Sequence, residues 1–140
     1  MVIIGIDFGY ARTGIAACDA LEMLASPVET INESYMPKVA KRISEIYAAR
    51  GAELAVVGLP LNMDGTCGEH GEASKELAEL LAGLGLNVTL FDERLTTVEA
   101  YGLLTEASTF GKKRRAAVDK LSAVIILEDY IKSKNRPDGV

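Results

Sequence analysis

The chain has 140 residues, of which 49% are hydrophobic and 25% charged, and its net charge is −5. This length predicts one domain with a full hydrophobic core, and the acidic balance excludes a protein that coats nucleic acid by bulk electrostatics. No apolar run approaches the length of a membrane span or of a secretion signal. Cys18 and Cys67 lack metal-ligand spacing and are expected to be reduced thiols. We therefore expect a cytoplasmic protein without a membrane segment.

The first predicted elements are three strands. Residues 2–7 form an apolar run that ends on the carboxylate of Asp7, and Gly9 and Gly14 bracket a turn. A second strand over residues 14–18 and a third over residues 25–30 follow. The hairpin presents Asp7 at its mouth, which fits a nuclease metal ligand, an ATPase with a phosphate-binding turn, or a side chain that caps the turn. ATPases that use a similar hairpin bind nucleotide between two such domains, so one domain weighs against that alternative.

Strands and helices alternate after the hairpin. Hydrophobic periodicity and breaker residues give the following expectations. The first is a helix over residues 37–50, capped by Asn32 or Ser34 and ended by Gly51, and it is followed by a strand over 54–59 and a loop over 62–71. A helix from 73 to 84 and a strand over 88–91 come next. The chain continues with a helix over 98–106 capped by Thr96 or Thr97, a loop over 108–113 and a last helix over 115–132. This order predicts an α/β fold, a mixed sheet with helices on both faces.

Acidic residues stand at the ends of three predicted elements. Asp7 ends the first strand, Asp92 and Glu93 follow the strand at 88–91, and Asp119 lies near the start of the last helix. Parallel strands expose their carboxyl ends at one sheet edge. Carboxylates gathered there repel one another without a cation, and oxygen ligands suit Mg²⁺ or Mn²⁺. Two such ions are typical of phosphodiester hydrolysis.

The last helix has its main predicted apolar stripe at residues 118, 121, 124 and 125. Asp119 lies off that stripe, on the side of Ser122 and Ala123. These residues are small, so the helix backbone is expected to approach the sheet closely on that side. An acid near a helix start is also favoured by the helix dipole alone, and this simpler interpretation of Asp119 stays open.

Four motifs resemble those of the YqgF (RuvX) family, whose members are described as Holliday junction resolvases and ribosomal RNA precursor nucleases. They are G-I-D-F-G at residues 5–9, V-G-L-P-L-N-M-D-G-T at 57–66, D-E-R-L-T-T at 92–97 and V-D-K-L-S-A at 118–123. The resemblance implies an RNase H-like fold with a five-stranded sheet. It also implies Asp7, Glu93 and Asp119 as catalytic acids that bind metal, and the choice of Glu93 over Asp92 rests on it.

Other residues are candidates for substrate binding. Lys112, Lys113, Arg114 and Arg115 form the strongest basic cluster of the chain, beside Asp119, and either contact phosphates or form a solvated face. Arg94 either holds a phosphate or pairs with Asp92. Asn62 and Asp64 either touch substrate or serve turn chemistry. His70, the single histidine, is assigned to the loop surface, with a role in proton transfer left open.

The sequence thus predicts one nuclease domain over residues 1–133 with a frayed tail over residues 134–140. The expected enzyme is a hydrolase that uses Mg²⁺ or Mn²⁺, with two ions expected, to cut structured nucleic acid, and the resemblance favours the precursor of the small-subunit ribosomal RNA. The alternatives are resolution of branched DNA, which requires two active sites and hence a dimer, and a non-catalytic nucleic-acid or ribosome-assembly binder. Whether the protein is a monomer or a homodimer stays open.

Overall fold

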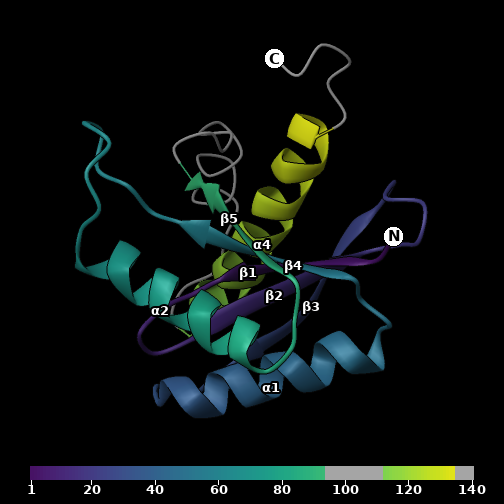
Figure 1. Ribbon diagram of the computed structural model, residues 1–140, viewed down its shortest axis with the longest axis horizontal. Helices are drawn as coiled ribbons and strands as arrows, with labels where there is room; N and C mark the ends of the chain where they lie inside the picture. Colours follow the sequence, from purple (N-terminus) through teal and green to yellow (C-terminus); the bar gives the residue numbers. More distant parts are fainter. Residues whose placement is uncertain (94–111, 135–140) are drawn as a thin grey trace.

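A mixed sheet forms the centre of the protein (Figure 1). The computed structural model describes residues 1–93 and 112–134, with the side chains of the last helix from Leu121 onward. Within these residues the sheet has five strands in the order β3-β2-β1-β4-β5. They are β1 (Ile3–Asp7), β2 (Thr13–Cys18), β3 (Ala25–Ile31), β4 (Leu54–Leu59) and β5 (Val88–Asp92). The three neighbours β1, β4 and β5 run parallel, and β2 and β3 are antiparallel, which confirms the predicted mixed sheet.

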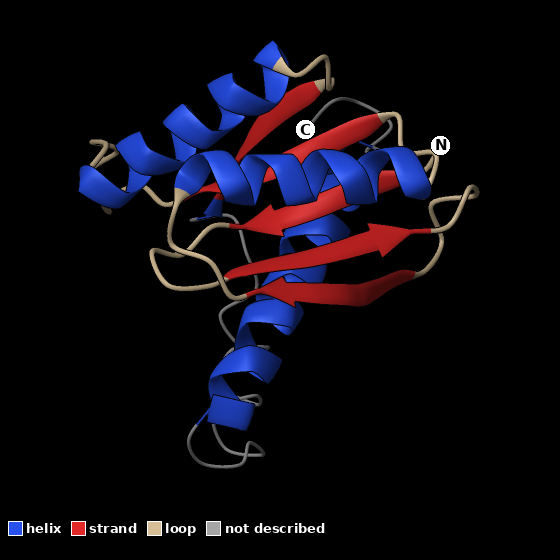
Figure 2. Cartoon of the chain, turned by 90° about the horizontal axis from the view of Figure 1, so that it is seen from below, coloured by secondary structure: helices blue, strands red, loops and turns tan. Residues whose placement is uncertain are grey.

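The described helices cover both faces of the sheet. Helices α1 (Met36–Ala49) and α2 (Glu69–Gly83) lie on one face, and α4 (Lys112–Lys134) crosses the other, as Figure 2 shows. Alternate residues of β1 divide between the two cores: Ile4 and Ile6 belong to the core under α1 and α2, whereas Ile3 belongs to the core under α4. The expectation of helices on both faces is therefore confirmed.

Helix α4 lies unusually close to the sheet. A Cβ atom added at Gly5 of β1 would stand 2.8 Å from the carbonyl oxygen of Ala123 and 2.9 Å from Cβ of Leu127. At Gly58 of β4, an added Cβ would stand 2.7 Å from Cδ1 of Ile126. Two strand glycines thus make room for the helix, and the predicted close approach beside Ala123 is confirmed.

The buried side of α4 differs from the stripe that the sequence predicted. Val124 and Ile125, two members of that stripe, are each 9% exposed, whereas Ala123, Ile126 and Leu127 are fully enclosed. The prediction followed residue size and overlooked that an alanine facing a glycine can be the point of closest contact. The deepest side of the helix is therefore the one that faces Gly5 and Gly58.

Helix α2 begins earlier than predicted, at Glu69 rather than near residue 73. The glycines around residue 70 predicted a loop, but Gly71 lies within the first turn. A Cβ at Gly71 would stand 2.9 Å from the carbonyl oxygen of Pro60 and would collide with the thiol of Cys67. Gly71 is therefore needed for close packing of the helix start against the chain that follows β4.

Two other helix starts correct the predictions. Helix α4 begins at Lys112 rather than residue 115, because lysine and arginine are good helix formers even in a run of like charge. Helix α1 has Tyr35 at its N-cap with no side-chain cap, instead of Asn32 or Ser34. The carboxylate of Glu33 accepts hydrogen bonds from the backbone N–H groups of Ser34 and Tyr35, each at 3.0 Å.

Several expectations fall on other parts of the chain. The helix over residues 98–106 and its threonine caps lie outside the described residues, as does the tail after residue 134. The single-domain boundary at residue 133 stays a prediction. Both cysteines are free thiols. None of the described helices combines the length and the apolar character needed to cross a membrane.

The contact at Gly5 generates a stability prediction. We expect Gly5→Ala to lower the free energy of unfolding by about 1–3 kcal/mol, because the new methyl group meets helix backbone that cannot move aside cheaply. Gly83→Ala is the matched control, since a Cβ there meets nothing within 4 Å. It should leave stability unchanged or raise it by up to about 1 kcal/mol. Urea unfolding followed by circular dichroism measures both, and equal stability of the two variants would contradict the close approach.

Candidate active site

The carboxyl ends of β1, β4 and β5 meet at one edge of the sheet, which we call the acid edge. These strands are parallel, and Ile6 pairs with Val57, so Asp7 lies beside Gly58. Gly58 in turn pairs with Phe91 of β5. The two strand ends that the sequence predicted to gather, those of β1 and β5, therefore lie at the same edge of the sheet with β4 between them.

Asp7 and Glu93 lie on the same face of the sheet. Gly5 faces α4, and Asp7, two residues further along β1, shares that face by strand alternation. Phe91 packs in the core under α4, and Glu93 follows it by two residues. The Cγ and Cδ atoms of Glu93 both lie 3.1 Å from the position of a Cβ on Gly58. The Glu93 side chain, together with Cδ1 of Ile126, thus occupies the room that the absent side chain of Gly58 leaves.

The register distinguishes Glu93 from Asp92. The sequence could not separate them by alternation, because both faces of the sheet were expected to be buried. In the structure Asp92 is the last residue of β5 and pairs with Leu59, one position out of phase with Phe91. Glu93, not Asp92, is therefore on the face that carries Asp7 and α4.

Asp119 lies in α4, where the structure describes the backbone. It precedes Ala123 by one turn and shares its helix face, and Ala123 is the residue that rests on Gly5. At the far end of the helix, Lys134 forms an ion pair of 2.6 Å with Glu22, in the turn between β2 and β3 at the opposite sheet edge. Position 119 is therefore on the sheet-facing side of α4, closer to the acid edge than Ala123 is.

No group of three or more His, Cys, Asp or Glu side chains suited to a metal ion occurs among the described side chains. Two of the predicted ligands, Asp7 and Glu93, belong to that described part, and the side chain of Asp119 does not. The structure thus brings two of the three predicted acids together around Gly58 and positions the backbone of the third.

The environment of Glu93 disfavours its negative charge. Burial raises the pKa of the Glu93 carboxyl above its usual range, nearby His70 partly offsets that rise, and Asp92 adds to it. A carboxylate that is half-buried beside other acids is stabilised most effectively by a cation. The electrostatics at Glu93 therefore fit a cation-binding site.

His70 has a place that the sequence did not reveal. It lies in the first turn of α2, not on a loop, and its Nε2 atom is 2.7 Å from the carbonyl oxygen of Phe8, the residue after Asp7. Its ring packs edge-on against the Phe8 ring at 5.9 Å. The acidic pair Glu69 and Glu72, typical of a first helical turn, was the signal that could have moved the predicted helix start.

Asn62 and Asp64 serve turn chemistry. The Asn62 side-chain amide donates to Oγ1 of Thr66 at 2.8 Å, and that hydroxyl donates to Oδ1 of Asp64 at 2.7 Å. The backbone N–H of Thr66 also donates to Asp64, and Gly65 has a positive φ of 89°. These contacts fix the exposed loop after β4, and direct contact of Asn62 with substrate stays a prediction.

The predicted basic cluster forms the start of α4. Lys112, Lys113, Arg114 and Arg115 are its first four residues, whereas the sequence predicted that the two lysines lie in a loop. Their position at the amino end of this helix puts them on the same element as Asp119, within two turns of it. Arg94 lies outside the described residues, so its phosphate contact stays a prediction.

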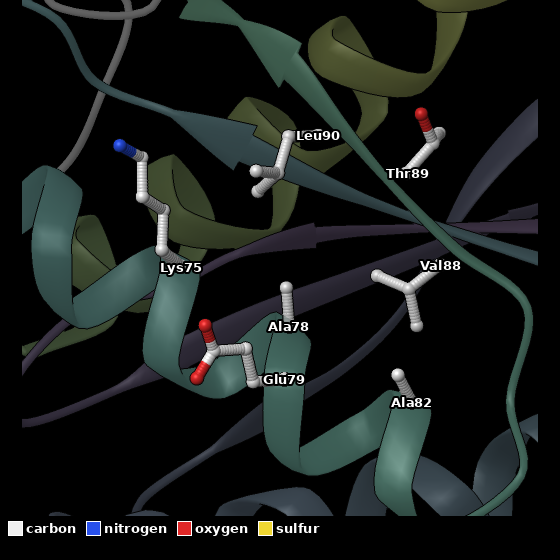
Figure 3. A pocket seen from close by; sticks show the side chains of 7 residues that line it. All are labelled: Lys75, Ala78, Glu79, Ala82, Val88, Thr89 and Leu90. Carbon is white, nitrogen blue, oxygen red and sulfur yellow. The ribbon is translucent and has the colours of Figure 1, made fainter.

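A separate hollow lies between α2 and the edge strand β5. It has a volume of about 430 Å³. Figure 3 shows Lys75 and Glu79 of α2 across from Leu90 and Val88 of β5. Val88 pairs with Ala55 at the start of β4, so the hollow begins at the end of β5 that is away from Glu93. It includes none of the predicted acids, and we do not assign the active site to it.

Solved structures with the same fold include Holliday junction resolvases. RuvC of T. thermophilus in complex with a Holliday junction substrate superposes with a TM-score of 0.59 at 14% identity, over 94% of this chain and 95% of that one. The yeast mitochondrial Holliday junction resolvase Ydc2 gives a TM-score of 0.55 at 10% identity, over 93% and 77% of the two chains. The fold is therefore the RNase H-like fold of RuvC-type resolvases, as the resemblance implied.

Sequence comparison identifies the family. The family model described as RuvX, Holliday junction resolvase, matches residues 1–133, and the chain belongs to this family of nucleases. A protein of Pelotomaculum thermopropionicum is 40% identical over 98% of this chain and 90% of its own length. One of Listeria monocytogenes serovar 1/2a is 44% identical over 96% and 100%. Both bear the name "Putative pre-16S rRNA nuclease". The family that the four motifs indicated is thereby confirmed.

The raised pKa of Glu93 predicts a pH-dependent stability. In the folded state the proton is bound more tightly than in the unfolded chain, so the charged carboxylate costs stability once the pH exceeds the unfolded value. In metal-free buffer near neutral pH, Glu93→Gln should therefore melt at a higher temperature than the native protein. The difference should shrink as the pH falls through the raised pKa of the folded state, and it should vanish once the pH is below the unfolded pKa of a glutamate, about 4.3.

Thermal unfolding in buffer with a chelator measures this effect. Glu76→Gln, at an exposed position on α2, is the control and should show no such trend. If the native protein melts at the same temperature as Glu93→Gln near neutral pH, or at a higher one, the environment of Glu93 does not disfavour its negative charge.

Proposed function

We propose that this protein is a divalent-metal-dependent nuclease that hydrolyses phosphodiester bonds of structured nucleic acid, with Asp7, Glu93 and Asp119 as the catalytic carboxylates. The observation that carries the proposal is the pair Asp7 and Glu93 on one sheet face, at the carboxyl ends of β1 and β5 on either side of Gly58. Membership in a nuclease family supports it. The backbone of α4 supports it as well, since position 119 lies on the helix face toward that same side of the sheet.

The chemistry of the donor set fits Mg²⁺ or Mn²⁺. Only carboxylate oxygens are proposed as protein ligands, and hard divalent cations prefer oxygen ligands. Burial destabilises the charge of Glu93, which is the cost that a bound cation would offset. Asp7, at the carboxyl end of β1, would be a ligand of the bound cations. When bound, two such ions supply an activated water and stabilise the oxygen that leaves.

The protein groups have separate roles in this proposal. Asp7 at the end of β1 and Glu93 directly after β5 would hold and orient the cations, and Asp119 would complete the ligand set from α4. Gly58 leaves room for the side chains of Glu93 and Ile126, because a Cβ atom there would lie against both. The rigidity of the sheet fixes the spacing of Asp7 and Glu93 and thereby the geometry of the hydrolytic step.

The substrate proposed is the precursor of 16S ribosomal RNA, cut in the maturation of its 5′ end in the cytoplasm. The relatives at 40% and 44% identity, which match nearly the whole chain, support RNA by their names. The second candidate is branched DNA, which the family description and the RuvC-like fold favour. Branched DNA would require a dimer with two active sites, whereas cleavage of an RNA end needs one.

The substrate contacts proposed are the basic start of α4, the loop at Asn62, and Arg94. Lys112, Lys113, Arg114 and Arg115 would bind backbone phosphates on the approach to Asp119. The loop after β4 is held in shape by its own hydrogen bonds, so Asn62 would contact substrate from a fixed position. Phosphate contacts position the strand and carry no sequence information.

Cleavage assays test the catalytic proposal. Labelled 16S precursor RNA and a four-way DNA junction are incubated side by side with Mg²⁺ or Mn²⁺. We expect the native protein to cut the RNA, and Asp7→Asn and Glu93→Gln to lower the rate by at least about 100-fold, since each removes a metal ligand. Glu53→Gln, at an exposed position directly before β4 and so at the end of that strand away from the acid edge, should cut like the native protein.

The same assay separates the alternatives. Cleavage of the junction but not the RNA would favour the resolvase. If the native protein cuts neither substrate, or if Asp7→Asn cuts as well as the native protein, the catalytic proposal fails. Normal ribosomal RNA maturation in cells that carry only Asp7→Asn would point instead to a non-catalytic binder.

The basic start of α4 gives a second prediction. Replacement of Lys113 and Arg114 by alanine should weaken RNA binding and flatten its salt dependence, by roughly 0.7–0.9 in the slope of log K against log salt for each phosphate that is no longer bound. The matched control replaces Lys38 and Lys41, two exposed lysines of α1. Binding isotherms at several salt concentrations measure both slopes. Equal slopes for the two double variants would assign the basic cluster to a solvated face.

A further inference from the structure

Two aromatic rings lie exposed next to the acid edge. Tyr10, in the turn that follows β1, is 55% exposed, and His70 of α2 is also exposed. Their ring centroids are 5.1 Å apart with an angle of 33° between the planes, so they form a tilted stack. One face of the Tyr10 ring is therefore covered by His70 while much of its surface remains open to solvent.

Contacts with Phe8 hold this ring pair in place. Phe8, buried at 5% exposure, packs edge-on against both rings, at 5.8 Å from Tyr10 and 5.9 Å from His70. The Nε2 atom of His70 is also bonded to the Phe8 carbonyl oxygen. A rigid ring at the surface loses little entropy when it binds a flat partner, and Asp7 is only three residues before Tyr10 in the chain.

Charge on the neighbouring surface restricts what can bind there. An open groove of about 490 Å³ runs from Tyr10 along the outer side of α2 and is lined by four glutamates and one lysine. Glu69, Glu72 and Glu76 belong to this lining, and like charge makes it unfavourable for phosphates. Bases are uncharged, and their amino groups donate hydrogen bonds to carboxylates.

We propose that the Tyr10–His70 ring pair stacks an unpaired nucleobase of the strand that enters the acid edge. This inference rests on the proposed function, because it takes nucleic acid as the substrate. A base on the exposed surface of Tyr10 adds a third ring to the existing stack. The glutamates of the groove repel phosphates, so the sugar–phosphate backbone lies on the side of the base away from the groove. The pair would therefore select substrates with a single-stranded nucleotide next to the cut over continuous duplex.

A double-mutant cycle between protein and RNA tests the stacking. The probe is a labelled single-stranded RNA of about 12 nucleotides, a length that spans a typical binding site, and a chelator prevents cleavage. Binding is measured by fluorescence anisotropy with the native protein, Tyr10→Leu and Tyr10→Phe. We expect Tyr10→Leu to weaken binding about five- to a hundredfold and Tyr10→Phe to change it less than about twofold, because the ring is retained.

The RNA side of the cycle removes one base at a time by abasic substitution. One abasic position should weaken binding to the native protein and have no further effect with Tyr10→Leu. Tyr35→Leu is the matched control: Tyr35 is 61% exposed at the start of α1 and has no assigned role in binding. A duplex of the same sequence should bind the native protein and Tyr10→Leu equally.

Three results would overturn the stacking proposal. The first is that Tyr10→Leu and the native protein bind the single strand with equal affinity. The second is that Tyr10→Leu lowers the affinity for single strand and duplex equally. The third is that the effects of Tyr10→Leu and of the abasic substitution are additive at every position of the RNA. Melting curves check that Tyr10→Leu folds like the native protein. Failure of the proposed nuclease is detected separately: a protein that stacks a base by this cycle but cuts neither precursor RNA nor junction would refute catalysis and leave the stacking intact.

Discussion

The direct contact between α4 and the sheet is the constraint on which the rest of the structure depends. Glycines at positions 5 and 58 remove the side chains that would hold the helix away, and Ala123 lets its backbone touch β1. A single methyl group at Gly5 would stand against a carbonyl oxygen of the helix. Because the helix cannot slide without opening this contact, the turn that carries Asp119 has a fixed relation to the strand that ends on Asp7.

Gly58 links this packing to the electrostatics of the site. The lack of a side chain at Gly58 makes room for Ile126 of α4 and for Glu93, which directly follows β5. The same glycine therefore affects both the packing of the core and the position of an acid at the acid edge. The consequence is a glutamate whose charge is disfavoured by burial and whose neighbours include another acid. Such an arrangement costs stability in the isolated protein, and a site that binds cations is the usual reason for retaining it.

Strands were easier to predict from the sequence than helix starts. Apolar runs ended by glycine, proline or acids placed all five described strands within one or two residues of their observed bounds. The predicted helix α2 was too short because Gly71 has a packing role that only its contact with Pro60 reveals. The predicted helix α4 was too short because its basic run resembled a loop. The buried side of α4 was misjudged because large residues were taken for the core, although a small residue facing glycine lies deepest.

The sequence by itself determined the order of strands and helices along the described chain, the family through four motifs, and the set of acids from which the site is drawn. It could not decide between Asp92 and Glu93, place His70, or reveal the ring pair with Tyr10. Those questions depend on register and on contacts between residues that are far apart in the chain, such as His70 and Phe8. The order of residue types shows the periodicity within one element. Whether acids from two different strands lie on the same face of the sheet is decided only when the strands pair in a particular register.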